Sequence, residues 1–283
     1  MTVENIRPPK PTPPKRSVLW PVLLVVVVAG LATWATLRRG VEVVPPAPST
    51  VAAPVATVPE DAPKYPVPEP PPAPATEDQA ARPPALPELA DSDADALAAL
   101  SALVGSGRVA DWIYTQHLIE RIVATVDALP RAKMAPLVLP VKRVAGSLVV
   151  DRSPTGESIA SANGERYAAH VQAFDALDSE AVVNTYRRWY PLFQRAYRQL
   201  GYPKGHFNDR LIEAIDDMLQ APVGAEPIAV RFTGQAWEYV DADMEARSVG
   251  QKLMLRIGAA NARTVQLKLR RLRVLLTAKP GAP

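Results

Sequence analysis

A run of 20 residues without a charged side chain, Val18–Leu37, restricts most strongly what this chain can fold into. An α-helix of about 20 residues spans the roughly 30 Å of hydrocarbon in a bilayer. Trp20 and Trp34 lie near the two ends of the run, where indole rings favour the membrane interface. The run has no polar face, which disfavours a buried helix of a soluble domain. The sequence therefore predicts a transmembrane helix that contacts the lipid bilayer through residues 18–37.

A cleaved signal peptide is the alternative interpretation of this run. The apolar part of a signal peptide is about 7–15 residues long and is followed by a small-x-small cleavage site. Here the run is longer, and it ends in Trp34 and the pair Arg38-Arg39. An uncleaved anchor is therefore the favoured interpretation.

The basic residues that flank the run predict its orientation. Four of them precede the run and two follow it: Arg7, Lys10, Lys15, Arg16, Arg38 and Arg39. Positive residues concentrate on the cytoplasmic side of membrane proteins. We therefore expect residues 1–17 to form a cytoplasmic tail and the anchor to lie in the inner (cytoplasmic) membrane. The C-terminal domain would then lie outside the cytoplasm, which in a bacterium is the periplasm.

Prolines separate a linker from a domain. Fifteen of the 31 prolines fall within residues 41–90, where neither helix nor sheet can propagate through them. The sequence predicts a disordered proline-rich linker at residues 38–90, a helical domain at 91–278 and a disordered tail at 279–283. A docking site for a proline-binding module is the less favoured interpretation of the linker.

Charge is distributed in three blocks that the net value of +3 hides. Residues 1–40 carry a net charge of +5, residues 41–249 carry −10, and residues 250–283 carry +8. The basic character thus comes from the two ends, so we expect no nucleic-acid partner for the body of the chain. The chain has no cysteine, which excludes disulfides and cysteine-based metal sites.

Apolar periodicity and turn residues divide residues 91–278 into short elements. A hairpin is expected between Leu148 and Ile159, around the turn Ser153–Gly156. The predicted fold is mainly α: a multi-helix domain with a small β-hairpin, preceded by a single transmembrane helix and a disordered linker. Helices are predicted at about 93–104, 109–129, 164–177, 179–200, 209–220, 243–257 and 261–278, and further extended pieces at 228–232 and 237–240.

Local signals predict where some helices begin and end. Asp178 or Ser179 is expected to cap the longest helix, and Gly201 to end it. Asn208 is predicted to be the N-cap of the helix that follows. Asp127 is expected on the outer side of the second helix, away from its apolar stripe.

Three ordered blocks of sequence occur together in the second half of the chain. They are Tyr186–Pro191 with Leu200–Pro203, Phe207–Leu211 with Glu213–Asp216, and Gly250–Leu253 with Asn261-Ala262. Together these blocks resemble the bacterial domain of unknown function 3014 family. The resemblance covers roughly residues 90–277 and implies a membrane-anchored envelope protein with no assigned activity. It supplies no catalytic residue.

Catalytic signatures are missing from the sequence. None of the three histidines stands in an HExxH motif, and no GxSxG, Walker A or GxGxxG motif occurs. We therefore predict no catalytic residue, no cofactor and no metal ligand. A carboxylate enzyme stays open as an alternative, because paired acids leave little sequence signature.

A stripe of aromatic residues carries the candidate binding surface. Tyr186, Tyr190, Phe193 and Tyr197 follow helical spacing, and Pro191 is expected to bend or restart their helix. Aromatic rings beside arginines could form a groove for a sugar or peptide, whereas an ordinary core stripe is the plainer interpretation. The candidate surface comprises Tyr186, Arg187, Arg188, Trp189, Tyr190, Tyr197, His206, Asn208, Asp209 and Arg210.

Two charged clusters have competing interpretations. His206, Asn208, Asp209, Glu213, Asp216 and Asp217 could hold a hard cation or act in acid–base chemistry, but a helix cap with solvated acids is favoured. The last predicted helix carries an apolar stripe and a basic face. That face could contact anionic lipid, nucleic acid or the acidic part of this chain, or could simply be solvated. Its apolar stripe is Val265, Leu269, Leu272 and Leu276, and its polar face is Arg263, Gln266, Arg270 and Arg273, with Lys268 and Arg271 nearby.

The favoured function is an anchored extracytoplasmic helical module that binds a protein partner or a cell-envelope component. The alternative is a cell-wall or small-molecule enzyme that uses carboxylates or tyrosines near Pro191. A cytosolic nucleic-acid binder is a weaker third interpretation. The sequence does not set the oligomeric state.

Overall fold

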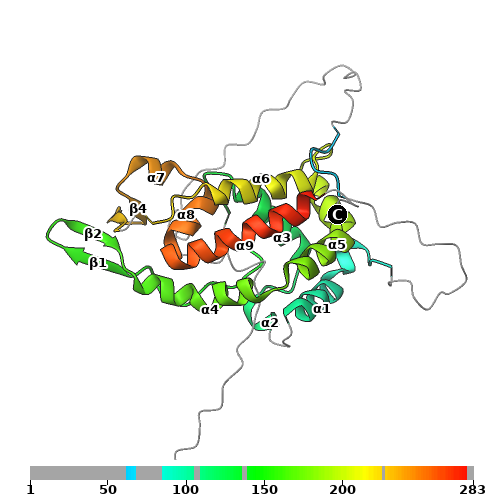
Figure 1. Cartoon of the computed structure of the whole chain (residues 1–283), viewed down its shortest axis with the longest axis horizontal. Coiled ribbons are helices and arrows are strands. Elements are labelled where there is room, and N and C mark those ends of the chain that lie inside the picture. Colours follow the sequence, from blue (N-terminus) through cyan, green and yellow to red (C-terminus); the bar gives the residue numbers. More distant parts are fainter. Residues whose placement is uncertain (1–61, 68–84, 105–108, 136–138, 225–226, 279–283) are drawn as a thin grey trace, which may run out of the picture.

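The computed structural model describes residues 62–67, 85–104, 109–135, 139–224 and 227–278, drawn in colour in Figure 1. The fold is mainly helical with a small antiparallel sheet, as the sequence predicted. The helices are η3 (Leu89–Asp91), α1 (Asp93–Val104), α2 (Val109–Trp112), α3 (Leu118–Ala128), α4 (Ala162–Ala176), α5 (Ser179–Gln199), α6 (Phe207–Leu219), α7 (Ala242–Ala246), α8 (Val249–Arg256) and α9 (Ala259–Thr277). The strands are β1 (Val150–Ser153), β2 (Gly156–Ile159), β3 (Ala229–Phe232) and β4 (Trp237–Tyr239).

The predicted anchor at residues 18–37 lies outside the described residues, as do residues 1–17 and 279–283. Within the described ranges, no helix combines the length and the apolar character needed to cross a membrane.

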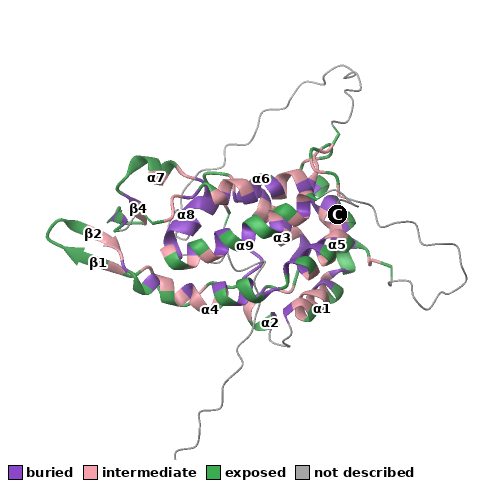
Figure 2. Cartoon of the chain, viewed as in Figure 1, coloured by how far each residue is buried: buried purple, intermediate pink, exposed green. Residues whose placement is uncertain are grey.

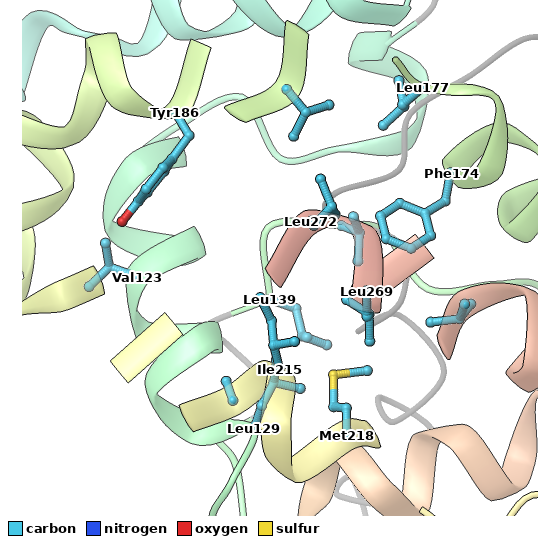
Figure 3. Close-up of a cluster of buried hydrophobic side chains, with 14 of the residues drawn as sticks. Val123, Leu129, Leu139, Phe174, Leu177, Tyr186, Ile215, Met218, Leu269 and Leu272 are labelled. Atoms are coloured by element: carbon cyan, nitrogen blue, oxygen red, sulfur yellow. The ribbon is translucent and has the colours of Figure 1, made fainter. Parts of the chain in front are cut away.

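The core forms where α3, α4, α5, α6 and α9 pack against one another. These five helices turn their buried sides inward and their exposed sides to solvent, as Figure 2 shows by colour. In Figure 3, Phe174 of α4 meets Leu269 and Leu272 of α9, with Ile215 and Met218 of α6 close by. The whole predicted apolar stripe of the last helix is buried, which confirms that prediction: Val265, Leu269, Leu272 and Leu276.

Helix α5 follows the predicted local signals. The Asp178 carboxylate accepts a hydrogen bond from the Ala181 N–H at 2.7 Å, as an N-cap does. Past the other end of the helix, Gly201 adopts φ +117°, a conformation open to glycine but rarely to other residues. The helix runs through Pro191 without an interruption, so the predicted restart is not found. Pro191 lies on the exposed side, where water can solvate the carbonyl that lacks its N–H partner.

Two predicted helices are each divided in the structure. The predicted helix at 109–129 is interrupted between α2 and α3, because Asp93 caps α3 from another part of the chain. Its carboxylate accepts hydrogen bonds from the N–H groups of His117 and Leu118, both at 2.8 Å, and His117 adopts φ +53°. The predicted helix at 243–257 is divided into α7 and α8, because the Ser248 hydroxyl caps α8 by accepting from the Gln251 N–H at 3.1 Å.

The predicted start of α6 is also corrected. Helix α6 begins at Phe207 and has His206, not Asn208, in the N-cap position. Asn208 is fully buried and its side chain makes tertiary hydrogen bonds instead.

The predicted hairpin is confirmed as β1 and β2, paired from Val150 with Ile159 to Ser153 with Gly156. The two further extended pieces are β3 and β4. They extend the hairpin into one antiparallel sheet in the order β1-β2-β3-β4, because Glu157 pairs with Val230. The sequence indicated these strands but not their pairing.

Two pieces of the predicted linker contact the helical domain. Leu86 and Leu89 pack against the core, and Glu88 forms an ion pair with Arg195 of α5. Further upstream, Tyr65 and Val67 pack against the same core. In this respect the structure differs from the predicted disordered linker of 38–90, because residues 62–67 and 85–90 bury apolar side chains.

Candidate functional site

A polar cleft of about 720 Å³ lies between the C-terminal end of α3, the loop between α5 and α6, and one side of α6. Figure 1 shows α6 and α3 side by side, with residues 62–67 next to the loop that precedes α6. The cleft is lined by carboxylates, by tyrosine rings and by cations. These are Asp127, Asp209, Glu213, Asp216 and Asp217; Tyr65, Tyr197 and Tyr202; and Lys64, Arg131 and Arg210.

Asp127 is the centre of the charge network in the cleft. Its side chain is only 9% exposed, and one oxygen lies 2.7 Å from Arg131 Nη2 while the other lies 3.1 Å from Arg210 Nε. The Tyr202 hydroxyl donates to the same carboxylate at 3.4 Å. Arg210 also pairs with Glu213 at 2.7 Å. The predicted outer position of Asp127 is wrong, because its carboxylate is surrounded by Arg131, four residues further along the chain, and by Arg210 and Tyr202 from other elements.

A second network fastens α6 to α8. Asp217 accepts hydrogen bonds from the Ser248 hydroxyl at 2.5 Å and from Gln251 Nε2 at 2.8 Å. Gly250 brings α8 close enough to α3 for its N–H to donate to the Leu129 carbonyl at 2.9 Å. These contacts join α3, α6 and α8 at one wall of the cleft.

The chain's own residues 62–67 form one edge of the cleft, which Lys64 and Tyr65 line. The N–H groups of Lys64 and Tyr65 donate to the two carboxylate oxygens of Asp209, at 3.0 and 2.8 Å. Asn208 Nδ2 donates to the Tyr65 carbonyl at 2.8 Å. The cleft thus holds polypeptide by its main chain.

The ten residues of the predicted binding surface do not form one surface. Tyr197, His206, Asp209 and Arg210 line the cleft, and buried Asn208 reaches it with its side-chain amide. Tyr186 and Trp189 are buried in the core, as the plainer interpretation expects.

Three further members of that surface lie apart from the cleft lining. Tyr190 is half-buried, and its hydroxyl donates to Gln194 Oε1 at 3.0 Å. Arg187 donates to the Leu275 carbonyl at 2.8 Å, and Arg188 is exposed. Sequence reasoning missed Asp127, Arg131 and Tyr202. The i,i+4 spacing of Asp127 and Arg131 was a local signal for their ion pair, whereas Tyr202 lies on a separate segment.

The five carboxylates of the cleft are each engaged by a protein group. Asp216 pairs with Arg273 of α9 at 2.5 Å, Asp209 binds main-chain N–H groups, and the other three belong to the networks above. Burial, with the nearby charge of Asp127, raises the pKa of Tyr197 to about 12, so its hydroxyl stays protonated near neutral pH. Among the described residues, no three or more histidine, aspartate or glutamate side chains form a group that could hold a metal ion.

The basic face predicted for the last helix is partly used inside the fold. Gln266 is buried and donates to the carbonyls of Leu219 and Ala221, both at 3.3 Å. Lys268 is buried and donates to the Asp175 carbonyl at 2.9 Å and to the Leu177 carbonyl. The Arg273–Asp216 pair is a contact with the acidic part of the chain, as one interpretation expected, whereas Gln266 and Lys268 bind main-chain carbonyls.

Comparison with known proteins gives one match. The model of the family described as a protein of unknown function (DUF3014) matches residues 118–273. This stretch begins at α3 and ends within α9, so it includes Asp127, Asn208, Asp209 and Arg210 but not residues 62–67. No curated protein and no solved structure matches the chain. Because the match covers more than half of the 283 residues, the chain belongs to the DUF3014 family.

Proposed function

We propose that this chain is a membrane-anchored module outside the cytoplasm that binds a protein partner through the cleft beside α6. The observation that carries the proposal is a set of hydrogen bonds by which Asn208 and Asp209 hold the main chain of a segment that bends at Lys64 and Tyr65. An asparagine and an aspartate that hold N–H and carbonyl groups in this way recognise polypeptide, whatever side chains it has.

The uncharged run Val18–Leu37 and the basic residues before it support the anchor and its orientation. In a bacterium the module would work in the periplasm, tethered to the inner membrane. The absence of a cofactor motif in the sequence and the engaged carboxylates of the cleft support binding over catalysis.

Two measurements test this function in the full-length chain. A C-terminal reporter that is active only outside the cytoplasm should be active, and a reporter that is active only in the cytoplasm should be silent. The reverse pattern would contradict the proposed location outside the cytoplasm and would exclude partners found there.

Photocrosslinking in cells tests the cleft. A photoreactive amino acid in place of Gln220, an exposed residue of the cleft lining, should capture a discrete protein partner. The matched control is Leu267, a 65% exposed residue of α9 outside the cleft lining, which should capture none. Equal capture at both positions, or capture at neither, would contradict the proposal.

A further inference from the structure

We infer that residues 62–67 are a ligand that the chain carries for its own cleft, and that the partner's binding segment is a proline-flanked peptide that competes with them. This inference rests on the proposed function and adds the class of ligand and its regulation. Its basis is the pattern of contacts between residues 62–67 and the start of α6.

The main-chain donors of the segment both bind one acceptor, the Asp209 carboxylate. Between Pro63 and Pro66, only Lys64 and Tyr65 have an N–H group, and both donate to Asp209, at 3.0 and 2.8 Å. Hydrogen bonds to a carboxylate are shorter and stronger than bonds between neutral groups. The segment therefore has no unused main-chain donor between its two prolines.

The main-chain acceptor of the segment, the Tyr65 carbonyl, is bound by an asparagine in a fixed orientation. Asn208 is 0% exposed, and its Oδ1 accepts from the Tyr186 hydroxyl at 3.0 Å. Its Nδ2 is thereby directed to the Tyr65 carbonyl, at 2.8 Å. Because burial raises the pKa of Tyr186 well above its ordinary value, the hydroxyl stays a donor and keeps the amide in this orientation.

Side chains add selectivity to the main-chain contacts. Tyr65 and Val67 pack against the core, and the Tyr65 side chain also hydrogen-bonds Arg273 of α9. Pro63 and Pro66 restrict the backbone before binding, which reduces the entropy lost on docking. The ligand class is thus a short peptide of the form Pro-x-aromatic-Pro that bends between its two prolines.

The position of the segment in the chain makes it a competitor. Residues 62–67 precede the family match at 118–273 and are separated from Ala85 by 17 residues, 68–84. A ligand tethered through a short stretch of its own chain acts at an effective concentration on the order of millimolar. A partner must therefore displace the segment, and a weak partner segment binds only when the segment is released.

Release of the segment also changes how far the domain can extend from the proposed anchor. With residues 62–67 docked, the 24 residues 38–61 join the anchor to the domain, a contour of at most ~86 Å. After release, the 47 residues 38–84 join them, a contour of at most ~170 Å. Binding of a partner and extension of the domain are thereby coupled.

The test uses a fluorescent peptide with the sequence of residues 60–69 and the purified full-length chain in lipid nanodiscs. A second chain has residues 62–67 replaced by six Gly/Ser residues. By fluorescence anisotropy, the replaced chain should bind the peptide at least tenfold more tightly than the natural chain. A peptide N-methylated at the positions of Lys64 and Tyr65 loses both donors and should bind the replaced chain at least tenfold more weakly. Asp209→Asn in the replaced chain should weaken binding similarly, with circular dichroism as the check that it folds.

Amide hydrogen exchange gives an independent measurement on the natural chain. The amides of Lys64 and Tyr65 should exchange slowly, and Asp209→Asn should accelerate them while the amides in the middle of α5 stay protected. Rapid exchange of both amides in the natural chain would overturn the inference.

The outcomes separate this inference from the proposed function. If both chains bind the peptide equally, residues 62–67 are not the ligand, while capture of a partner at Gln220 would still support the proposed function. If the peptide binds as expected and Gln220 captures no partner, the cleft takes proline-flanked peptide and the proposed function fails. If docking occurs only in a dimer whose formation depends on protein concentration, the segment binds a second copy and the competition within one chain is wrong.

Discussion

Asp127 of α3 and Arg210 of α6 form an ion pair with an N–O distance of 3.1 Å and side chains that are only 9% and 14% exposed. The pair connects the end of one core helix to the side of another, at the centre of the cleft. Arg131 pairs with the same carboxylate but is 47% exposed, so it replaces Arg210 only in part.

Arg210→Met should lower the free energy of unfolding by about 2–4 kcal/mol, because it leaves the buried Asp127 carboxylate short of a partner. Urea unfolding of the purified chain, followed by far-ultraviolet circular dichroism, measures the change. The control is Arg152→Met, which removes an exposed ion pair with Glu157 in the hairpin and should cost less than about 1 kcal/mol. Equal losses in the free energy of unfolding for the two variants would contradict the claim that the buried Asp127–Arg210 pair stabilises the fold more than an exposed pair does.

Gly250→Ala should lower the free energy of unfolding by about 1–3 kcal/mol, because the added methyl group overpacks the contact between α8 and α6. A Cβ atom at this position would lie 2.7 Å from Met218 Cγ and 3.3 Å from the Leu129 carbonyl oxygen. The matched control is Gly164→Ala in the first turn of α4, where the nearest atom is the Ile257 carbonyl oxygen at 3.5 Å. That variant should change stability by no more than about 0.5 kcal/mol, and thermal unfolding compares the two.

Lys268→Met should destabilise the domain by about 1–3 kcal/mol, because the carbonyls of Asp175 and Leu177 lose a charged donor at the end of α4. Methionine keeps the length and the apolar stem of lysine, so the loss reports the hydrogen bonds. Arg270→Met on the exposed side of the same helix is the control and should be nearly neutral. Faster amide exchange in the last turn of α4 should accompany the loss in the Lys268 variant alone.

Stability should fall as the pH drops below about 6.5, in part through His170. Burial of this side chain, whose ring lies 4.6 Å from that of Trp112, lowers its pKa below the ordinary value of 6.5. Between the lowered and the ordinary pKa, the unfolded chain binds more protons than the folded chain. The contribution is therefore complete above pH 6.5 and is lost as the pH falls toward the lowered pKa.

His170→Phe keeps a ring against Trp112 and removes the titration, so unfolding midpoints measured from pH 7.5 to 5 should fall less steeply than in the natural chain. If the unfolding midpoint of the His170 variant fell with pH as steeply as that of the natural chain, other groups would be responsible for the pH dependence.

From the sequence alone, the elements that are determined by nearby residues were predictable. Helix α5 begins at the Asp178 cap and ends before Gly201, and the β1–β2 hairpin turns at Ser153–Gly156. The buried stripe of α9 was visible as helical periodicity. Ser248 followed by Gln251 has the pattern of a capping box and could have revealed the start of α8, although Gln251 uses its side chain to bind Asp217.

Only the tertiary structure decided the contacts between residues far apart in the chain. The Asp93 carboxylate interrupts the helix at His117, β2 pairs with β3 across some seventy residues, and Arg210 brings Asp127 into the interior. The cleft depends on the same kind of contact, since Asn208 has the sequence pattern of a helix cap and instead binds Tyr65. The physical reason is that one polar side chain can satisfy a nearby or a distant backbone group at similar free energy. Packing of the core helices decides which group comes within reach.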